Sequence, residues 1–145
     1  MGSIEHHKKR IKEHLAELND AVDAGLENKP VTVGLHCSAC SIELLELYLH
    51  SLHKIPLGKV VKHNWFKKPH AQQKIAPLAE RKLGVDFPEK EKIYALLYTV
   101  EDLRENLVYG NPSFSQIKKV FDAFLALKAE LLTKLKKEGI PLEES

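Results

Sequence analysis

The sequence has few of the residues that dominate loop-rich or fibrous proteins, and it has no long apolar run. Seven glycines and seven prolines among 145 residues exclude a collagen-like, elastic or loop-dominated chain. No apolar stretch approaches the roughly 20 residues that cross a bilayer. Residues 1–12 are polar and charged and contain no apolar signal-peptide core. We therefore expect a protein that makes no membrane contact and resides in the cytoplasm.

The chain does contain enough apolar residues for one core. Hydrophobic residues make up 43% of it and charged residues 29%, which excludes a disordered chain. A length of 145 residues fits one domain of ordinary size. We therefore expect a single domain over residues 1–145.

Acidic residues are missing from one part of the chain. The formal net charge is only +2, but Leu47 to Ala79 contains no Asp or Glu and holds six lysines and four of the eight histidines. Such an asymmetry is typical of a protein with an anionic partner. The alternative interpretation is a solvated basic edge that aids solubility.

The spacing of apolar residues predicts helices and no strands. Asp86 followed by Glu89, and Ser113 followed by Gln116, have the spacing of a capping box at a helix start. Five helices are predicted, at residues 4–26, 31–52, 70–83, 86–108 and from 113 to about 138. The second is apolar almost all the way round, as in a central helix. The predicted fold class is all-α, an antiparallel bundle of four or five helices.

Two charged residues fall on apolar helix faces. At 100° per residue, Arg104 lies within the apolar stripe of the fourth predicted helix, and Glu46 lies within that of the second. Glu43 is the competing acid. A guanidinium stays protonated, so on an apolar face it needs an acid or an anionic ligand. Arg104 therefore either forms a structural ion pair with one of these acids or lines a site in which an acid orients it.

Arg104 also begins a segment that resembles a known motif. In the HEPN superfamily, an Arg near the end of a bundle helix is followed by a polar residue, several further residues and a His. Residues 104–110, which read Arg-Glu-Asn-Leu-Val-Tyr-Gly, resemble this motif, with Asn106 as a polar residue. Residues 34–43 are similar to the second-helix segment of the family, where a His leads through small residues towards a Glu. The helix layout matches over about residues 4–137.

The resemblance implies a fold and an activity. It implies a four- or five-helix bundle that dimerises, with a composite site where the Arg motifs of two subunits meet. In active members it implies metal-independent RNA cleavage, in which the 2′-hydroxyl attacks its own phosphate. Many members are toxins paired with a nucleotidyltransferase-like antitoxin. Carried over to this chain, the site residues are Arg104, Asn106 and Tyr109, with Glu46 or Glu43 as the acid and no cofactor.

One position departs from the motif, because Tyr109 stands where the family has His. A phenol exchanges protons poorly at neutral pH, whereas an imidazole does so readily. Another histidine, such as His63, replaces it only if the fold brings that side chain in. The sequence therefore favours an RNA-binding protein, or a ribonuclease weakened by loss of the His, over a fully active enzyme.

Two cysteines and two histidines have a spacing similar to that of a zinc-binding motif, hereafter the zinc-like string. Cys37-x-x-Cys40 is followed by His50-x-x-His53. In one continuous helix Cys37 and His50 lie about 20 Å apart, whereas zinc ligands lie about 2.0–2.3 Å from the ion. We therefore predict that both cysteines are core residues without metal or disulfide. A metal site with other histidines and a redox pair are the alternatives.

Basic, aromatic and polar residues are interleaved between residues 62 and 68, within a basic loop that begins at Lys59. This interleaving suits single-stranded RNA, because lysines bind phosphates and aromatic rings stack on bases. Alternatively, Trp65 or Phe66 is a staple that pins the loop to the core. The RNA-binding candidates are Lys59, Lys62, His63, Trp65, Lys67 and Lys68.

The leading hypothesis is a HEPN-like, homodimeric RNA-binding protein, with RNA or a nucleotidyltransferase-type antitoxin as its partner. A different class of function remains open, namely a non-catalytic adaptor bundle that binds protein and keeps Arg104 in a structural ion pair. A third alternative is a helical bundle that binds a metal ion.

Overall fold

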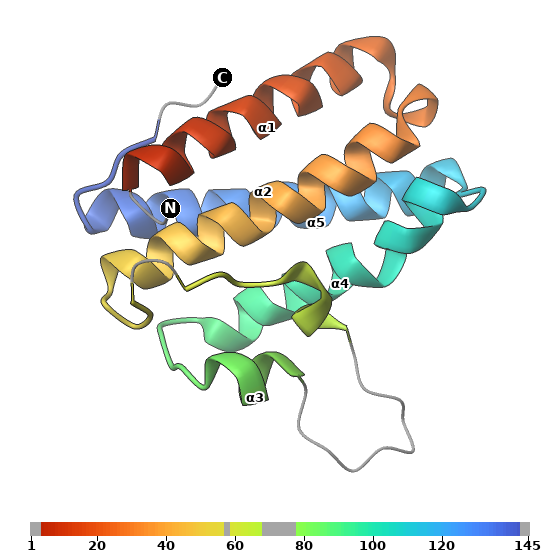
Figure 1. The fold of residues 1–145 in the computed structure, drawn as a ribbon. Helices are drawn as coiled ribbons and strands as arrows, with labels where there is room; N and C mark the ends of the chain where they lie inside the picture. The colour runs from red at the N-terminus through yellow and green to blue at the C-terminus, as the bar shows by residue number, and fades with distance from the viewer. Residues whose placement is uncertain (1–3, 57–58, 68–77, 143–145) are drawn as a thin grey trace.

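The computed structural model describes residues 4–56, 59–67 and 78–142, and every regular element within them is helical. The α-helices are α1 (Ile4–Ala24), α2 (Pro30–Ser51), α3 (Leu78–Leu83), α4 (Lys90–Tyr109) and α5 (Phe114–Lys137). Two short 3₁₀ helices, η1 (Leu26–Asn28) and η2 (His63–Phe66), lie in the connections. The predicted all-α class is confirmed (Figure 1).

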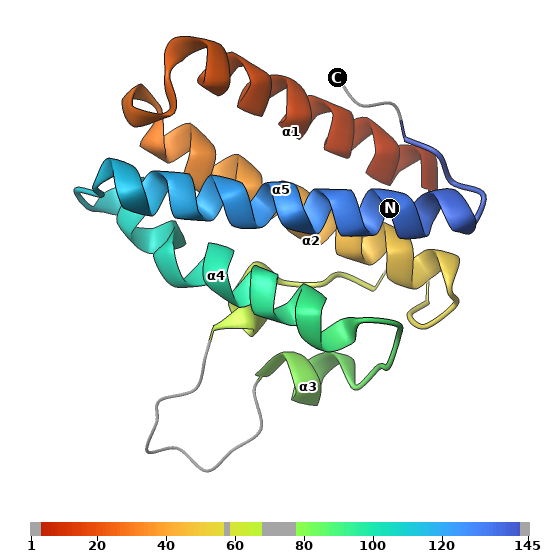
Figure 2. The same cartoon turned by 180° about the vertical axis from the view of Figure 1, so that it is seen from behind.

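Helix α2 lies at the centre of the bundle. It packs against α1, α4 and α5, and the views from the front and from behind show these helices around it (Figures 1 and 2). A helix enclosed on several sides must be apolar nearly all round, as the sequence predicted for this segment. None of the helices in the described ranges is long and apolar enough to span a bilayer.

The outer helices bury one stripe each. In α1 the buried residues include Ile11, Leu15 and Leu18, and in α5 they include Phe124 and Leu131. These residues recur at intervals of three, four or seven, which places them on one face of a helix. Each stripe therefore faces α2 and closes the single core.

A close approach between α2 and α4 fixes where the end of α4 lies. A Cβ atom added at Gly34 would stand 3.0 Å from side-chain atoms of both Leu107 and Val108. The missing side chain thus lets the backbones come together. This contact sets the last two turns of α4, including Arg104, against the first half of α2.

The predicted helix starts are partly confirmed. Ser113 and Gln116 form the expected capping box at the start of α5. The predicted start at Asp86 is wrong, because α4 begins at Lys90 and Glu89 precedes it in a left-handed conformation (φ 59°). The buried ring of Phe87 packs edge-on against neighbouring tyrosines, so residues 86–89 form an anchored turn instead.

The third predicted helix is seen only in its last part, α3, because residues 68–77 lie outside the described ranges.

Candidate functional site

The segment that carries η2 is pinned to the helices by its two aromatic residues. Phe66 is 1% exposed and lies 5.1 Å from Tyr94 of α4, ring centre to ring centre. Trp65 is 8% exposed, and the Lys59 Nζ atom lies 5.9 Å from the centre of its ring. Both aromatic residues are therefore staples. The burial of Trp65 leaves little of its ring for stacking on RNA bases, and it favours the alternative of a staple.

Pinning η2 in this way sets His63 against α4. The His63 Nδ1 atom lies 2.5 Å from Glu101 Oε1. Glu101 is buried, and its second carboxylate oxygen accepts a hydrogen bond of 3.1 Å from the Ser38 hydroxyl of α2. The carboxylate is thus fixed from both sides. It orients the imidazole of His63, whose side chain is 41% exposed.

Arg104 lies one turn beyond Glu101 on the same face of α4. Both residues line a hollow of about 450 Å³, hereafter the η2–α4 hollow. The Nε atom of Arg104 is buried and has no hydrogen-bond partner among the described residues. The lining of the hollow consists of His63, Asn64, Lys67, Glu101, Asp102, Arg104 and Glu105.

Of the two alternatives for Arg104, an ion pair with an acid of α2 is not formed within the described part of the chain. Glu43 instead accepts from Arg10 at 3.2 Å and lies 2.6 Å from His7 Nδ1. Glu46 accepts a hydrogen bond from the Val61 backbone N–H at 3.1 Å. Glu43 follows Gly34, which faces α4, by nine positions of helix, so the two lie on opposite sides of α2. The acids therefore face α1 and the segment before η2.

The ionisation of the two acids follows from these contacts. Burial alone would raise the pKa of Glu43, but hydrogen bonds from His7 and Arg10 outweigh it, so that the pKa is lowered. The pKa of Glu46 is raised, mainly by burial, because a single backbone hydrogen bond compensates less.

Two further motif residues lie away from the η2–α4 hollow. Tyr109 is 77% exposed and follows Arg104 by five residues of unbroken helix, which places it about 140° further round. Asn106 donates to Gln116 Oε1 at 3.0 Å, and the same oxygen accepts from the Ser113 backbone N–H. Asn106 thus ties the end of α4 to the start of α5. The structure does not place either residue beside Arg104.

The predicted RNA-binding lysines are divided between two sides of the segment. Lys67 lines the η2–α4 hollow and lies 3.8 Å from Glu105, an exposed acid. Lys62 lines a neighbouring hollow of about 410 Å³, which also contains Arg10 and His63. Lys68 lies outside the described residues.

Sequence reasoning missed Ser38 and Glu101. Glu101 precedes Arg104 by three residues and therefore shares its helix face. This spacing could have indicated that Glu101 lies beside Arg104. Nothing in the sequence alone indicates that Ser38, His63 and Glu101 meet, because they belong to three different segments.

The two cysteines are core residues, as predicted. Both are free, fully buried and on the continuous helix α2. Burial raises the pKa of Cys40 to about 12 and raises that of Cys37 well above its ordinary value. Neither thiol is therefore a nucleophile at neutral pH.

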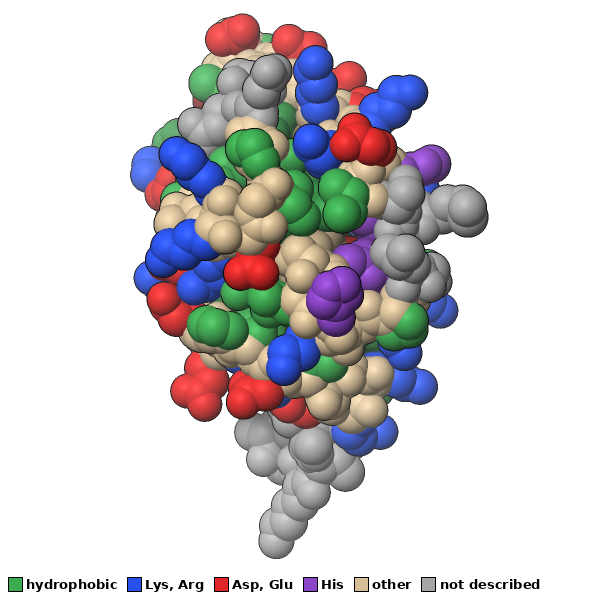
Figure 3. All heavy atoms as spheres, turned by 90° about the vertical axis from the view of Figure 1, so that its left-hand side faces the viewer, with side chains coloured by type: hydrophobic (Ala, Val, Ile, Leu, Met, Phe, Trp, Pro, Cys, Tyr) green, Lys and Arg blue, Asp and Glu red, His purple; other side chains and the backbone are tan. Residues whose placement is uncertain are grey.

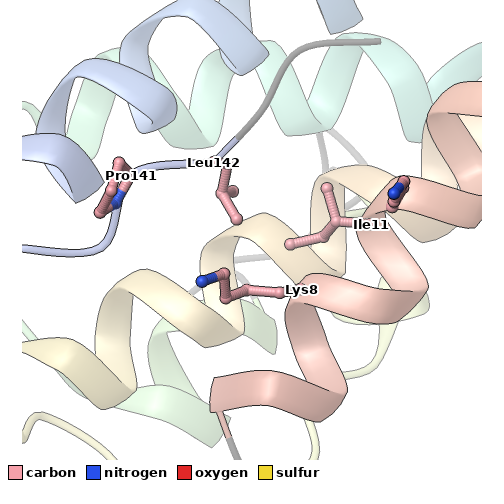
Figure 4. Close-up of a pocket in the computed structure, with 5 residues that line it drawn as sticks. Lys8, Ile11, Pro141 and Leu142 are labelled. Atoms are coloured by element: carbon pink, nitrogen blue, oxygen red, sulfur yellow. The ribbon is translucent and has the colours of Figure 1, made fainter.

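A further hollow, of about 440 Å³, lies between α1 and the segment that follows α5 (Figure 4). Lys8, Ile11, Lys12, Pro141 and Leu142 line it. This lining contains no acid and no imidazole.

No family model, curated protein or solved structure matches the chain. The resemblance to the HEPN superfamily, with its antitoxin partner, therefore stays a prediction from the sequence motifs.

Proposed function

We propose that the protein binds single-stranded RNA in the η2–α4 hollow and cleaves it without a metal ion. The observation that carries this proposal is the short contact between His63 and the buried carboxylate of Glu101, in the same hollow as Arg104. An oriented imidazole beside a guanidinium combines a proton-transfer group with a phosphate-binding group.

The chemistry follows from these two side chains. In the proposed mechanism Nδ1–H of His63 donates a hydrogen bond to Glu101, and Nε2 of the neutral ring carries the lone pair. In the proposed reaction Nε2 takes the proton of a ribose 2′-hydroxyl, and the 2′-oxygen forms a bond to the adjacent phosphorus. The bond from phosphorus to the 5′-oxygen breaks, and water supplies the proton for that oxygen. The products are a 2′,3′-cyclic phosphate and a 5′-hydroxyl.

Arg104 supports the same step through its charge. A guanidinium binds a phosphate through paired hydrogen bonds and stabilises the negative charge that grows in the transition state. Arg104 forms no ion pair with an acid of the described chain, and its Nε atom lacks a partner. Its guanidinium is therefore not committed to an acid of the described chain.

His63 takes the role that the motif gives to the residue at position 109. From the motif alone, the absence of the His predicted a ribonuclease of reduced activity. In the structure an imidazole reaches the same hollow from η2, which belongs to another part of the chain. This placement supports an active ribonuclease over a binding protein that has lost its catalytic group.

The neighbourhood of the hollow offers lysine and arginine side chains for the phosphates of a strand. Lys67 lies in the hollow, and Lys62 and Arg10 lie in the neighbouring one. Of the three acids in the η2–α4 hollow, Glu101 contacts His63 and Glu105 lies near Lys67. Asp102 is exposed at the rim.

The experiment measures cleavage of a fluorescent single-stranded RNA with chelator present. We expect His63→Gln to lower the rate by about 10²–10⁴-fold, the usual contribution of a general base. Arg104→Ala should weaken both binding and cleavage. His53→Asn is the matched control, because His53 is an exposed histidine of the same basic stretch with a left-handed backbone (φ 57°) that Asn tolerates. Equal rates for wild type and His63→Gln would contradict the proposal.

A further inference from the structure

Three buried side chains meet at the end of the bundle where α1 begins and α2 ends. They are His7 of α1 and Glu46 and His50 of α2, with 1%, 7% and 5% exposure. One ligand atom from each lies within 4.8 Å of the other two. Residues 46 and 50 are four apart, so they share one face of α2, and His7 reaches that face from the neighbouring helix. Figure 3 looks onto this end of the bundle, where histidine side chains gather.

Each of the three side chains is held by a second contact on its outer side. His7 Nδ1 lies 2.6 Å from Glu43 Oε1, and His50 Nδ1 lies 3.4 Å from the Ile55 carbonyl oxygen. The second oxygen of Glu46 accepts from a backbone N–H, as described above. Such outer contacts fix the orientation of metal-ligating side chains.

These outer contacts use the Nδ1 atom of each histidine and leave its Nε2 atom facing the other two side chains. The Ile55 carbonyl only accepts, so His50 Nδ1 carries the proton and Nε2 carries the lone pair. The Glu43 carboxylate, which also accepts from Arg10, accepts from Nδ1–H of His7, so that Nε2 of the neutral ring carries the lone pair. Neither Nε2 atom has a hydrogen-bond partner among the described residues. Two lone pairs and a carboxylate oxygen thus face one another in the interior, where unpartnered polar atoms destabilise the fold.

A bound cation would give these lone pairs and the carboxylate oxygen a partner. We propose that His7 Nε2, His50 Nε2 and Glu46 Oε1 bind a divalent transition-metal ion of the zinc type. Two imidazoles and one carboxylate form a known zinc ligand set that leaves a fourth position for water. The oxygen-preferring ions Mg²⁺ and Ca²⁺ suit this set poorly.

The distances are compatible with a site that closes around its ion. His7 Nε2 and Glu46 Oε1 lie 3.9 Å apart, whereas ligands about 2.1 Å from a tetrahedral zinc ion lie roughly 3.4 Å from each other. The side chains therefore need to move inwards by less than roughly 1 Å. Glu46 also lines the hollow of about 410 Å³ beside Val61, which gives the ion a route of entry.

The site shares only His50 with the zinc-like string in the sequence. Cys37 and Cys40 do not belong to it, and His53 is exposed outside it. It is also independent of the proposed RNA cleavage, which is measured with chelator present.

The test is calorimetric titration of Zn²⁺ into chelator-treated protein. We expect one ion per chain, a higher melting temperature in its presence, and no binding of Mg²⁺. Glu46→Gln and His50→Gln should each weaken zinc binding by about 10–100-fold or more. The matched control is His36→Gln, because His14 and His36 form a second histidine pair between α1 and α2, with their Nδ1 atoms 2.9 Å apart.

Three results would overturn the proposal. They are no binding of Zn²⁺ by the wild type, unchanged affinity in both site variants, and loss of binding in His36→Gln alone. Circular dichroism checks that the variants fold. If the variants do not fold, Co²⁺ is added to the wild type instead. A visible absorption spectrum of a four- or five-coordinate ion, together with shifted NMR signals of the His7 and His50 rings, supports the site. Unshifted ring signals would reject it.

Discussion

At the scale of single residues, Arg104 shows what a helix wheel reveals and what it omits. Its place on the apolar face of α4 was predicted from spacing, but its neighbours were not. The acids on α2 pair with α1 and with the segment before η2, so Arg104 faces His63 and Glu101 instead. Arg104 therefore does not stabilise the fold through an ion pair with an acid of α2.

The first prediction concerns the stability of Arg104→Ala. Removing one partner of a buried ion pair costs about 3–5 kcal/mol, but no acid of the described chain loses an ion pair with Arg104 here. We expect the free energy of unfolding in urea to fall by about 1 kcal/mol or less. Arg10→Ala, which leaves Glu43 with His7 alone, is the comparison. A loss of 3 kcal/mol or more in Arg104→Ala would show a structural ion pair after all.

The second prediction concerns the thiols. Because burial raises the pKa of Cys40 to about 12 and that of Cys37 strongly, almost no thiolate exists at pH 8, and reaction with a thiol reagent should be slow. Both cysteines should react rapidly once the protein is unfolded in guanidinium. Rapid labelling of the native protein at pH 8 would contradict the buried position of these side chains.

At the scale of elements, periodic features were predictable and contacts between distant segments were not. The central position of α2 and the Ser113 cap follow from local patterns. The start of α4 was misplaced, because the tertiary packing of Phe87 overrides the capping spacing of Asp86. The placement of His63 depends on Trp65 and Phe66 docking against the helices, which no local pattern records.

The third prediction follows from the unbroken end of α4. The motif resemblance suggests that Tyr109→His restores a missing catalytic group. Position 109 lies about 140° round the helix from Arg104, so we expect no increase in RNA cleavage over wild type in this variant. The double variant His63→Gln with Tyr109→His should be as inactive as His63→Gln alone. Rescue by the new histidine would show that the end of α4 unwinds when RNA binds.

At the scale of the whole molecule, one end of the bundle carries exposed apolar side chains. Val31, Leu35, Tyr109 and Phe114 are between 37% and 77% exposed. They belong to the start of α2, the end of α4 and the start of α5. The contact at Gly34 joins α2 to α4, and the hydrogen bond from Asn106 to Gln116 joins α4 to α5. Such a patch is typical of an interaction surface. The dimer predicted from the motif resemblance is therefore tested at these side chains.

The fourth prediction is that this end forms a homodimer in solution. Light scattering at micromolar concentration should give twice the mass of the chain. Tyr109→Lys combined with Phe114→Lys should give a monomer, since charges on an apolar interface must be desolvated. Val60→Lys is the control, because Val60 is 61% exposed on the segment before η2. A monomeric wild type would reject the dimer.

The central claim is that His63 and Arg104 use the ribose 2′-hydroxyl to cleave RNA. Its most direct test compares one single-stranded RNA with the same sequence carrying a single 2′-deoxy nucleotide at the cleaved position, both with chelator present. We predict that the wild type cleaves only the RNA with the hydroxyl, and leaves a 2′,3′-cyclic phosphate. Two results would contradict the claim. One is cleavage of both strands at equal rates, and the other is cleavage of both strands no faster than by His63→Gln.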